Sequence, residues 1–190
     1  MKYFLGFLAV VTLVVVVFIV VLRGFTGNSN KPKDQINLVD YTNSQTVVKY
    51  TVDGPVNSEA KHQGYRITVG RDGNTIEIVQ GYQNNVTKAQ TYDNNTAAYG
   101  NFLRALQLQN FTKGIDDGKG GTTSDDRGVC PNGNRYTFEI ETAGQTVQRF
   151  WTTTCGGGTF RGNTDTIRSL FLRQIPDYAK VTSGVNLSAY

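Results

Sequence analysis

The sequence predicts an α+β protein with an N-terminal transmembrane helix, followed by an antiparallel β-sheet with two helices packed on one face. The first observation is a twenty-residue apolar segment near the N-terminus. The second is that the polar remainder of the 190-residue chain is long enough for one core but short for two domains. The third is that segments of alternating apolar residues are followed by segments in which such residues recur every three or four positions.

The apolar segment from Tyr3 to Leu22 contains no charged residue, and only Gly6 and Thr12 interrupt it. At about 1.5 Å per residue, a helix of this length spans about 30 Å, the thickness of a bilayer's hydrocarbon core. The alternative, a cleaved signal peptide, has a shorter apolar region that ends in a small-x-small site, and no Ala-x-Ala follows here. We therefore expect residues 1–23 to form an uncleaved membrane anchor.

Behind the anchor, residues 24–45 predict a flexible tether, because glycine and asparagine are frequent there and apolar residues are few. A strand is expected over residues 45–52 (QTVVKYTV), where β-branched residues are concentrated. We assign residues 46–178 to the α+β domain and residues 179–190 to a C-terminal tail.

The range 64–82 carries the clearest local pattern, with apolar residues at alternate positions on both sides of a glycine-containing turn. This pattern predicts a β-hairpin. We place its tight turn at Asp72-Gly73 or Gly73-Asn74, with residues at positive φ. Residues 86–92 are expected to add a third strand.

Two segments have the spacing of an amphipathic helix, residues 95–109 and residues 164–175. Asparagine or threonine stands at the start of each, where its side chain can cap the free backbone N–H groups. The candidate caps are Asn94, Asn95 or Thr96 for the first helix and Asn163 or Thr164 for the second. The residues expected on the buried faces are Tyr99, Phe102, Leu103 and Leu106, and then Ile167, Leu170, Phe171 and Ile175.

A second hairpin is predicted from residues 134–141 and 145–152, with a turn at residues 142–144. Facing positions in a hairpin have a nearly constant sum, and a turn centred on Ala143 brings Cys130 close to Cys155. We therefore predict that these two cysteines form a disulfide. The alternative is two buried free thiols. The sequence has no CxxC motif, and two cysteines with one distant histidine are a poor zinc set, so we expect no metal.

The predicted disulfide decides the orientation of the anchor. Lys2 favours a cytoplasmic N-terminus, but Arg23, Lys31 and Lys33 oppose it, so the positive-inside rule is close to a tie. Disulfides persist in oxidising compartments. We therefore expect a single-pass protein of the cell membrane, with a cytoplasmic N-terminus and an extracytoplasmic domain.

No catalytic set is evident in the sequence, and we expect no catalytic residue and no cofactor. His62 is the only histidine, and no serine stands in a GxSxG pattern. Glycosidase-type carboxylate pairs stay open, because any two acids can converge in space. Glu139 and Glu141 are expected to face solvent. The aspartates of residues 114–128 do not follow a calcium-loop pattern, so we expect a mobile surface loop there.

The composition favours a binding role. Asparagine, threonine, glycine and tyrosine are frequent, and Trp151 lies beside Phe150 and Arg149 on the second hairpin. We predict Trp151 and Arg149 as binding residues. The alternative is that Trp151 is the core residue of its hairpin. Nucleic acid is not an expected partner, because the net charge is only +4 and the basic residues are scattered.

The C-terminal stretch from Arg149 through Thr159-Phe160 to Tyr178, together with the overall layout, resembles small anchored extracytoplasmic proteins of candidate-phylum bacteria. This resemblance implies a location but no activity, and no site residue follows from it. The leader around Gly6-Phe7 is similar to that of type IV pilin-like proteins. However, valine stands at position 11, where those proteins have a glutamate.

The function predicted from the sequence is a membrane-anchored extracytoplasmic module that binds protein partners or cell-wall glycan without catalysis. The first alternative is a type IV pilin-like filament subunit. The second is a cell-wall hydrolase that uses His62 or a carboxylate pair. The ligand and the oligomeric state are not predicted.

Overall fold

The computed structural model describes residues 36–115, 126 and 128–188. The chain divides into two units, residues 1–35 and residues 36–190, and the described residues belong to the second. The predicted anchor, most of the predicted tether and most of the predicted loop at residues 114–128 lie outside the described residues. In the part of the chain that is described, no helix is long and apolar enough to cross a membrane.

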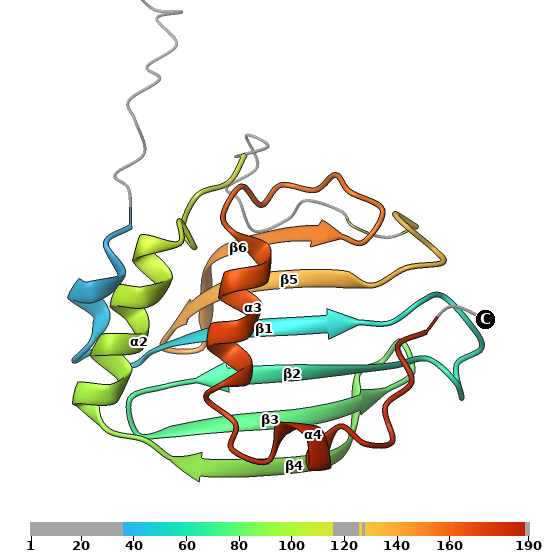
Figure 1. The fold of residues 1–190 in the computed structure, drawn as a ribbon, viewed down its shortest axis with the longest axis horizontal. Coiled ribbons are helices and arrows are strands. Elements are labelled where there is room, and N and C mark those ends of the chain that lie inside the picture. The colour runs from blue at the N-terminus through green and yellow to red at the C-terminus, as the bar shows by residue number, and fades with distance from the viewer. Residues whose placement is uncertain (1–35, 116–125, 127, 189–190) are drawn as a thin grey trace, which may run out of the picture. The chain divides into compact units, whose positions relative to one another are not determined.

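The domain is an α+β structure built on one antiparallel sheet of six strands, in the order β4-β3-β2-β1-β5-β6 (Figure 1). Both hairpins and the third strand were predicted. The six strands are β1 (Thr46–Asp53), β2 (Gln63–Val69), β3 (Gly73–Gln80), β4 (Asn85–Asp93), β5 (Arg135–Thr142) and β6 (Gln145–Thr153). Strand β1 lies at the centre, where it pairs with β2 on one side and with β5 on the other.

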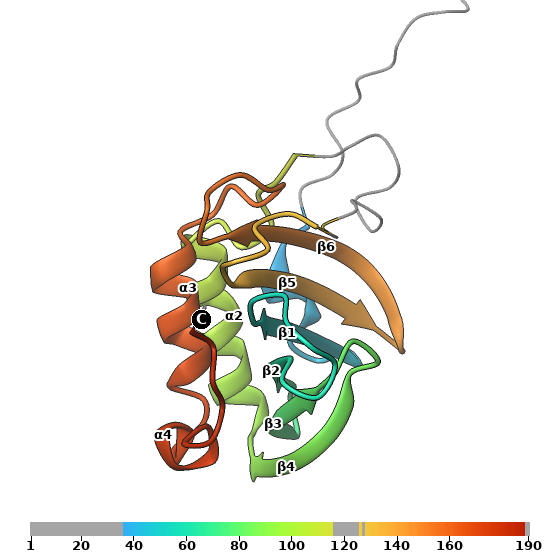
Figure 2. The same ribbon diagram turned by 90° about the vertical axis from the view of Figure 1, so that its right-hand side faces the viewer.

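The two main helices, α2 (Thr96–Leu108) and α3 (Thr164–Leu172), cover the same face of the sheet (Figures 1 and 2). Asn95 and Asn163 cap them by accepting hydrogen bonds from Ala98 N and Thr166 N. The core between helices and sheet is rich in aromatic rings, and the Tyr50 ring of β1 lies 5.5 Å from the Phe171 ring of α3. The predicted helical faces are buried, except that Leu170 is only partly so.

Alternation along β1 divides the sheet into two chemically different faces. Val48, Tyr50 and Val52 are buried against the helices, whereas Lys49 and Asp53 lie on the opposite side and are partly exposed. The neighbouring strands follow the same period of two. We call the side away from α2 and α3 the open face. It carries Lys49, Thr51, Asp53, Arg66, Glu77, Arg135, Thr137, Glu139, Glu141 and Arg149.

The folded unit is longer at both ends than the sequence predicts. The predicted tether extends to residue 45, but a 3-10 helix, η1 (Leu38–Tyr41), packs against α2, and Leu38 is fully buried. The predicted tail begins at residue 179, but α4 (Tyr178–Val181) buries Val181 in the core. In both segments one apolar side chain is buried and a few others pack partly against the core, which is too irregular a pattern to detect in a sequence.

The turns of the two hairpins differ from the prediction. The first connects Val69 to Asn74 through four residues, with a hydrogen bond from Gly70 N to Gly73 O, and none of its residues has positive φ. The second has two residues, Ala143 and Gly144, both at positive φ as a type I′ turn requires. Glycine marks a turn in the sequence but does not specify its length.

The predicted disulfide between Cys130 and Cys155 is present, with a Cα–Cα distance of 5.7 Å. The two cysteines lie just beyond the paired end of the hairpin, where Arg135 faces Thr153. Closing a loop of this length contributes about 3.5 kcal/mol in the chain-entropy account. The disulfide therefore ties the segment before β5 to the segment after β6.

Candidate functional site

Ion pairs connect neighbouring strands across the open face. Lys49 of β1 pairs with Glu141 of β5, and Arg66 of β2 pairs with Glu77 of β3 at 2.7 Å. On β6, Arg149 Nε lies 3.5 Å from Glu139 Oε1. Glu139 and Glu141 were predicted to face solvent, but their side chains are only 21% and 23% exposed. The open face is therefore a polar layer in which charges neutralise one another.

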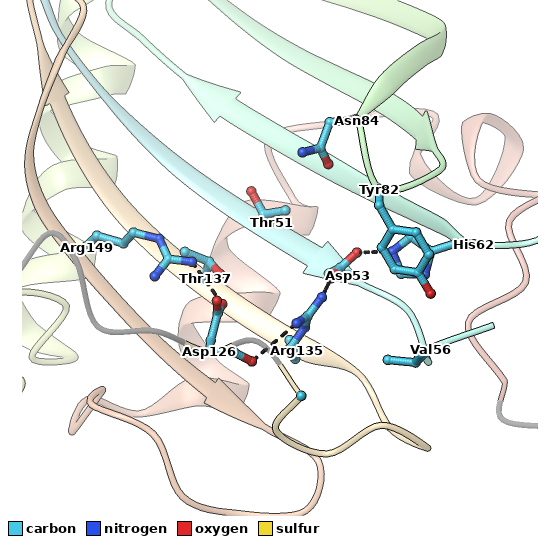
Figure 3. Close-up of a pocket in the computed structure, with 11 residues that line it drawn as sticks. Thr51, Asp53, Val56, His62, Tyr82, Asn84, Asp126, Arg135, Thr137 and Arg149 are labelled. Atoms are coloured by element: carbon cyan, nitrogen blue, oxygen red, sulfur yellow. Dashed lines mark hydrogen bonds and ion pairs between the residues drawn. The ribbon is translucent and has the colours of Figure 1, made fainter. Parts of the chain in front are cut away.

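A pocket of about 440 Å³ opens on this face, at the end where β1 finishes and β5 begins (Figure 3). Its floor comes from three adjacent strands and its walls come from the loops that flank them. The floor consists of Thr51, Asp53, Arg135, Thr137 and Arg149, and the walls consist of Val56, His62, Tyr82, Asn84, Asp126 and Gly128. We call these eleven residues the open-face pocket. Its volume lies within the range of small-ligand sites.

Asp53 is the central charged group of the pocket. Its Oδ1 lies 2.7 Å from His62 Nε2, and its Oδ2 accepts a hydrogen bond from the Arg135 guanidinium. His62 is 3% exposed, and its Nδ1 lies 3.1 Å from Pro55 O. Both ring nitrogens therefore face oxygen atoms, which fixes the orientation of the ring.

Asp126 joins two arginines on the other side of the pocket. Its carboxylate accepts from Arg149 Nη2 at 2.9 Å, and its backbone oxygen accepts from Arg135 Nη1 at 3.2 Å (Figure 3). Burial lowers the pKa of Arg135, and the positive charge of Arg149 lowers it further. Each arginine is thus held close to the other by an aspartate between them.

The aromatic ring of Tyr82 is half-exposed and yet held in place. It stacks on the His62 ring with a centroid distance of 4.2 Å and an angle of 15° between the planes. Its hydroxyl donates to Asn57 O at 2.7 Å and accepts from Asn57 N at 3.0 Å. Its backbone N–H donates to the Glu59 carboxylate. Few degrees of freedom are left to this ring.

The wall that contains Asp126 and Gly128 belongs to the segment that the disulfide holds. Gly133 N donates to Cys130 O, and Pro131 O accepts from Val56 N at 2.7 Å. This last bond joins the disulfide segment to the opposite wall. The disulfide therefore supports the shape of the pocket as well as the stability of the domain.

Glu139 lies beside the pocket, next to Arg149. Burial raises the pKa of its carboxyl, and the charges of Arg149, Lys49 and Arg66 oppose that effect. The net effect is a raised pKa, because burial outweighs the three positive charges. This carboxylate is consequently a costly charge, which its neighbours only partly compensate.

The two predicted binding residues have different positions. Arg149 lines the pocket. Trp151 faces Thr137 across the β5–β6 ladder but is only 7% exposed, and it is not among the described lining residues. Trp151 is not a member of the core cluster between the helices and the sheet, so both of its predicted roles, binding residue and core residue of its hairpin, stay predictions.

His62 was considered as a catalytic base, whereas the sequence did not single out Asp53, Arg135 or Tyr82. Alternation places Asp53 and Arg135 on polar faces of their own strands. Nothing in the sequence shows that the two strands pair in this register, 82 residues apart. In the described part of the chain, no group of three or more histidine, cysteine or acidic residues could hold a metal ion.

No protein-family model matches this chain, and no curated protein matches it. The resemblances to small anchored proteins of candidate-phylum bacteria and to pilin-like proteins therefore stay predictions.

Proposed function

We propose that this protein is a membrane-anchored, extracytoplasmic binding module, and that its ligand occupies the open-face pocket without being turned over. The ligand class expected from the sequence is a protein partner or a cell-wall glycan. The observation that carries the proposal is the convergence of polar side chains from three strands and three loops on one concave site.

The location in this proposal depends on two features. One is the apolar segment from Tyr3 to Leu22, which is long enough to span a bilayer. The other is the bond between Cys130 and Cys155, which is of a kind that persists outside reducing compartments. Together they favour a domain that is exposed on the outer side of a membrane.

The hydrolase alternative has one observation in its favour, because Asp53 and Asp126 line the same pocket. A glycosidase needs one carboxyl group that can give a proton to the leaving group. Here each carboxylate is bonded to an arginine, and both nitrogens of His62 are engaged. These contacts favour binding over hydrolysis.

The test uses the full chain in detergent, incubated separately with purified cell-wall sacculi and with solubilised envelope proteins. Thr51→Tyr fills the pocket from its floor. Thr68→Tyr is the matched control, because Thr68 lies on the open face outside the pocket. We expect the wild-type protein to bind one of the two fractions, the Thr51→Tyr variant to lose this binding and the Thr68→Tyr variant to keep it. We expect no release of sugar reducing ends in any of these incubations.

Two results would contradict the proposal. Equal retention of the wild-type protein and the Thr51→Tyr variant in every fraction would show that the pocket is not the binding site. Release of new reducing ends that stops when Asp53 or Asp126 is replaced by asparagine would support the hydrolase instead.

A further inference from the structure

The charges of the open-face pocket are arranged in neutral pairs. The Arg135 guanidinium is bonded to Asp53, and that of Arg149 is bonded to Asp126. An anionic ligand would have to compete with these aspartates, and a cationic one would have to compete with the arginines. The pocket therefore suits a ligand without a strong net charge.

The floor and the wall of the pocket both carry hydrogen-bond donors and hydrogen-bond acceptors. Thr51 and Thr137 face each other on adjacent strands, and their hydroxyls can donate and accept. The side-chain amide of Asn84 adds two donors and an acceptor at the rim. A ligand that fits must present closely spaced donors and acceptors of its own.

Tyr82 adds an apolar surface to this polar site. Tyr82 is 46% exposed although one face of its ring is covered by His62. The electron-rich face of an aromatic ring attracts the slightly positive C–H groups of a ligand laid flat on it. Because two hydrogen bonds to Asn57 hold the ring, it loses little freedom when a ligand binds.

We infer that the open-face pocket binds a saccharide, with one pyranose ring stacked on Tyr82. A pyranose ring has a flat row of C–H groups on one side and hydroxyls, each both donor and acceptor, around its edge. Those hydroxyls bond to the Asp53–Arg135 pair and to Thr51 and Thr137. This inference rests on the proposed function, from which it selects glycan over protein.

The volume of the pocket, about 440 Å³, limits what can be recognised. It accommodates a short oligosaccharide segment rather than an extended protein surface, which would bury roughly 800 Å² on each partner. Recognition of a polymer would therefore occur at one or two sugar rings at a time. Affinity for a soluble fragment is expected to be modest, and attachment to a repeating polymer is expected to be stronger.

The experiment measures binding of the full chain in detergent by calorimetry. The probes are chitotetraose, cellotetraose and peptidoglycan strands from which the peptides have been removed, with tetra-alanine as the negative control. We expect saturable binding of at least one saccharide probe and none of tetra-alanine. Tyr82→Ala should weaken that binding at least tenfold, because it removes the stacking surface.

Two further variants separate stacking from folding. Tyr82→Phe keeps the ring face that the sugar contacts but loses the two hydrogen bonds to Asn57, so it should weaken binding less than Tyr82→Ala does. Leu108→Ala alters a 74% exposed side chain on α2, away from the open face, and should bind like the wild-type protein. Thermal unfolding of each variant checks that the domain stays folded.

Three results would overturn the inference. The first is saccharide binding that Tyr82→Ala leaves unchanged. The second is wall binding that disappears when the peptides are removed. The third is retention of an envelope protein that Thr51→Tyr abolishes while no saccharide binds, and in that case the proposed binding function stands. Absence of binding both to the envelope fractions and to the saccharide probes would contradict the proposed binding function and this inference together.

Discussion

Asp53 connects structure and function at the scale of single residues. It is the last residue of β1, and its carboxylate holds both His62 and Arg135. His62 in turn supports the ring of Tyr82 through stacking. One carboxylate thus orients a wall and the floor of the open-face pocket.

Replacing Asp53 by alanine should therefore destabilise the domain. The change leaves the guanidinium of Arg135 and one nitrogen of His62 without their carboxylate partner, although both are largely buried. We expect a loss of about 2 kcal/mol in the free energy of unfolding, measured in urea. Asp72→Ala is the control, because the Arg71–Asp72 pair is exposed and should contribute much less. Equal losses for the two variants would contradict this role of Asp53.

Glu139 makes stability depend on pH in a direction that can be worked out. Burial raises its pKa in the folded protein above the ordinary value of 4.5, so the folded state holds this proton more tightly than the unfolded chain. As pH rises from 4.5 through the raised pKa, the unfolded state loses its proton first and the folded state becomes relatively less stable.

Glu139→Gln removes this titration. The stability of the variant relative to the wild-type protein should therefore increase between pH 4 and pH 7, which urea unfolding at both pH values will measure. A difference that stays constant, or that changes in the opposite direction, would show that the surrounding cations outweigh burial at this carboxyl group.

At the scale of elements, local sequence patterns predicted most of the helices and strands. They did not predict which strands that are distant in the sequence pair with one another. The spacing of Tyr99, Phe102, Leu103 and Leu106 predicted α2, since one turn of helix repeats every 3.6 residues. The pairing of β1 with β5 could not be inferred, because strand alternation is the same for any partner. The candidate site depends on that pairing. For this reason Arg149 is the one lining residue that was predicted to bind a ligand.

The second hairpin contains a residue that is strained in its turn. Ala143 has φ of 49°, a conformation in which its Cβ is crowded, whereas asparagine tolerates it well. Ala143→Asn should stabilise the domain by about 0.5–1 kcal/mol in urea unfolding. Ala143→Val should destabilise it, because a β-branched side chain is unfavourable at positive φ. The opposite order of the two variants would exclude a type I′ turn.

At the scale of the whole molecule, we propose a membrane anchor joined to a disulfide-bonded domain. Intact mass of the protein from its native membrane, with and without reduction before thiol alkylation, tests both features together. We expect the mass of the full chain, with or without Met1, and two alkylated thiols only after reduction. A chain beginning at Phe7 would favour the pilin-like alternative, and two thiols that react without reduction would contradict the proposed location.

The central claim is that the open-face pocket is where this protein binds its ligand. The most direct measurement is a titration of the ¹⁵N-labelled full chain in detergent micelles with soluble wall-glycan fragments, followed by amide chemical shifts. The account predicts saturable shifts centred on Thr51, Tyr82 and Thr137, and their loss in Thr51→Tyr. Shifts confined to α2 and α3 would contradict it, as would shifts that persist in this variant.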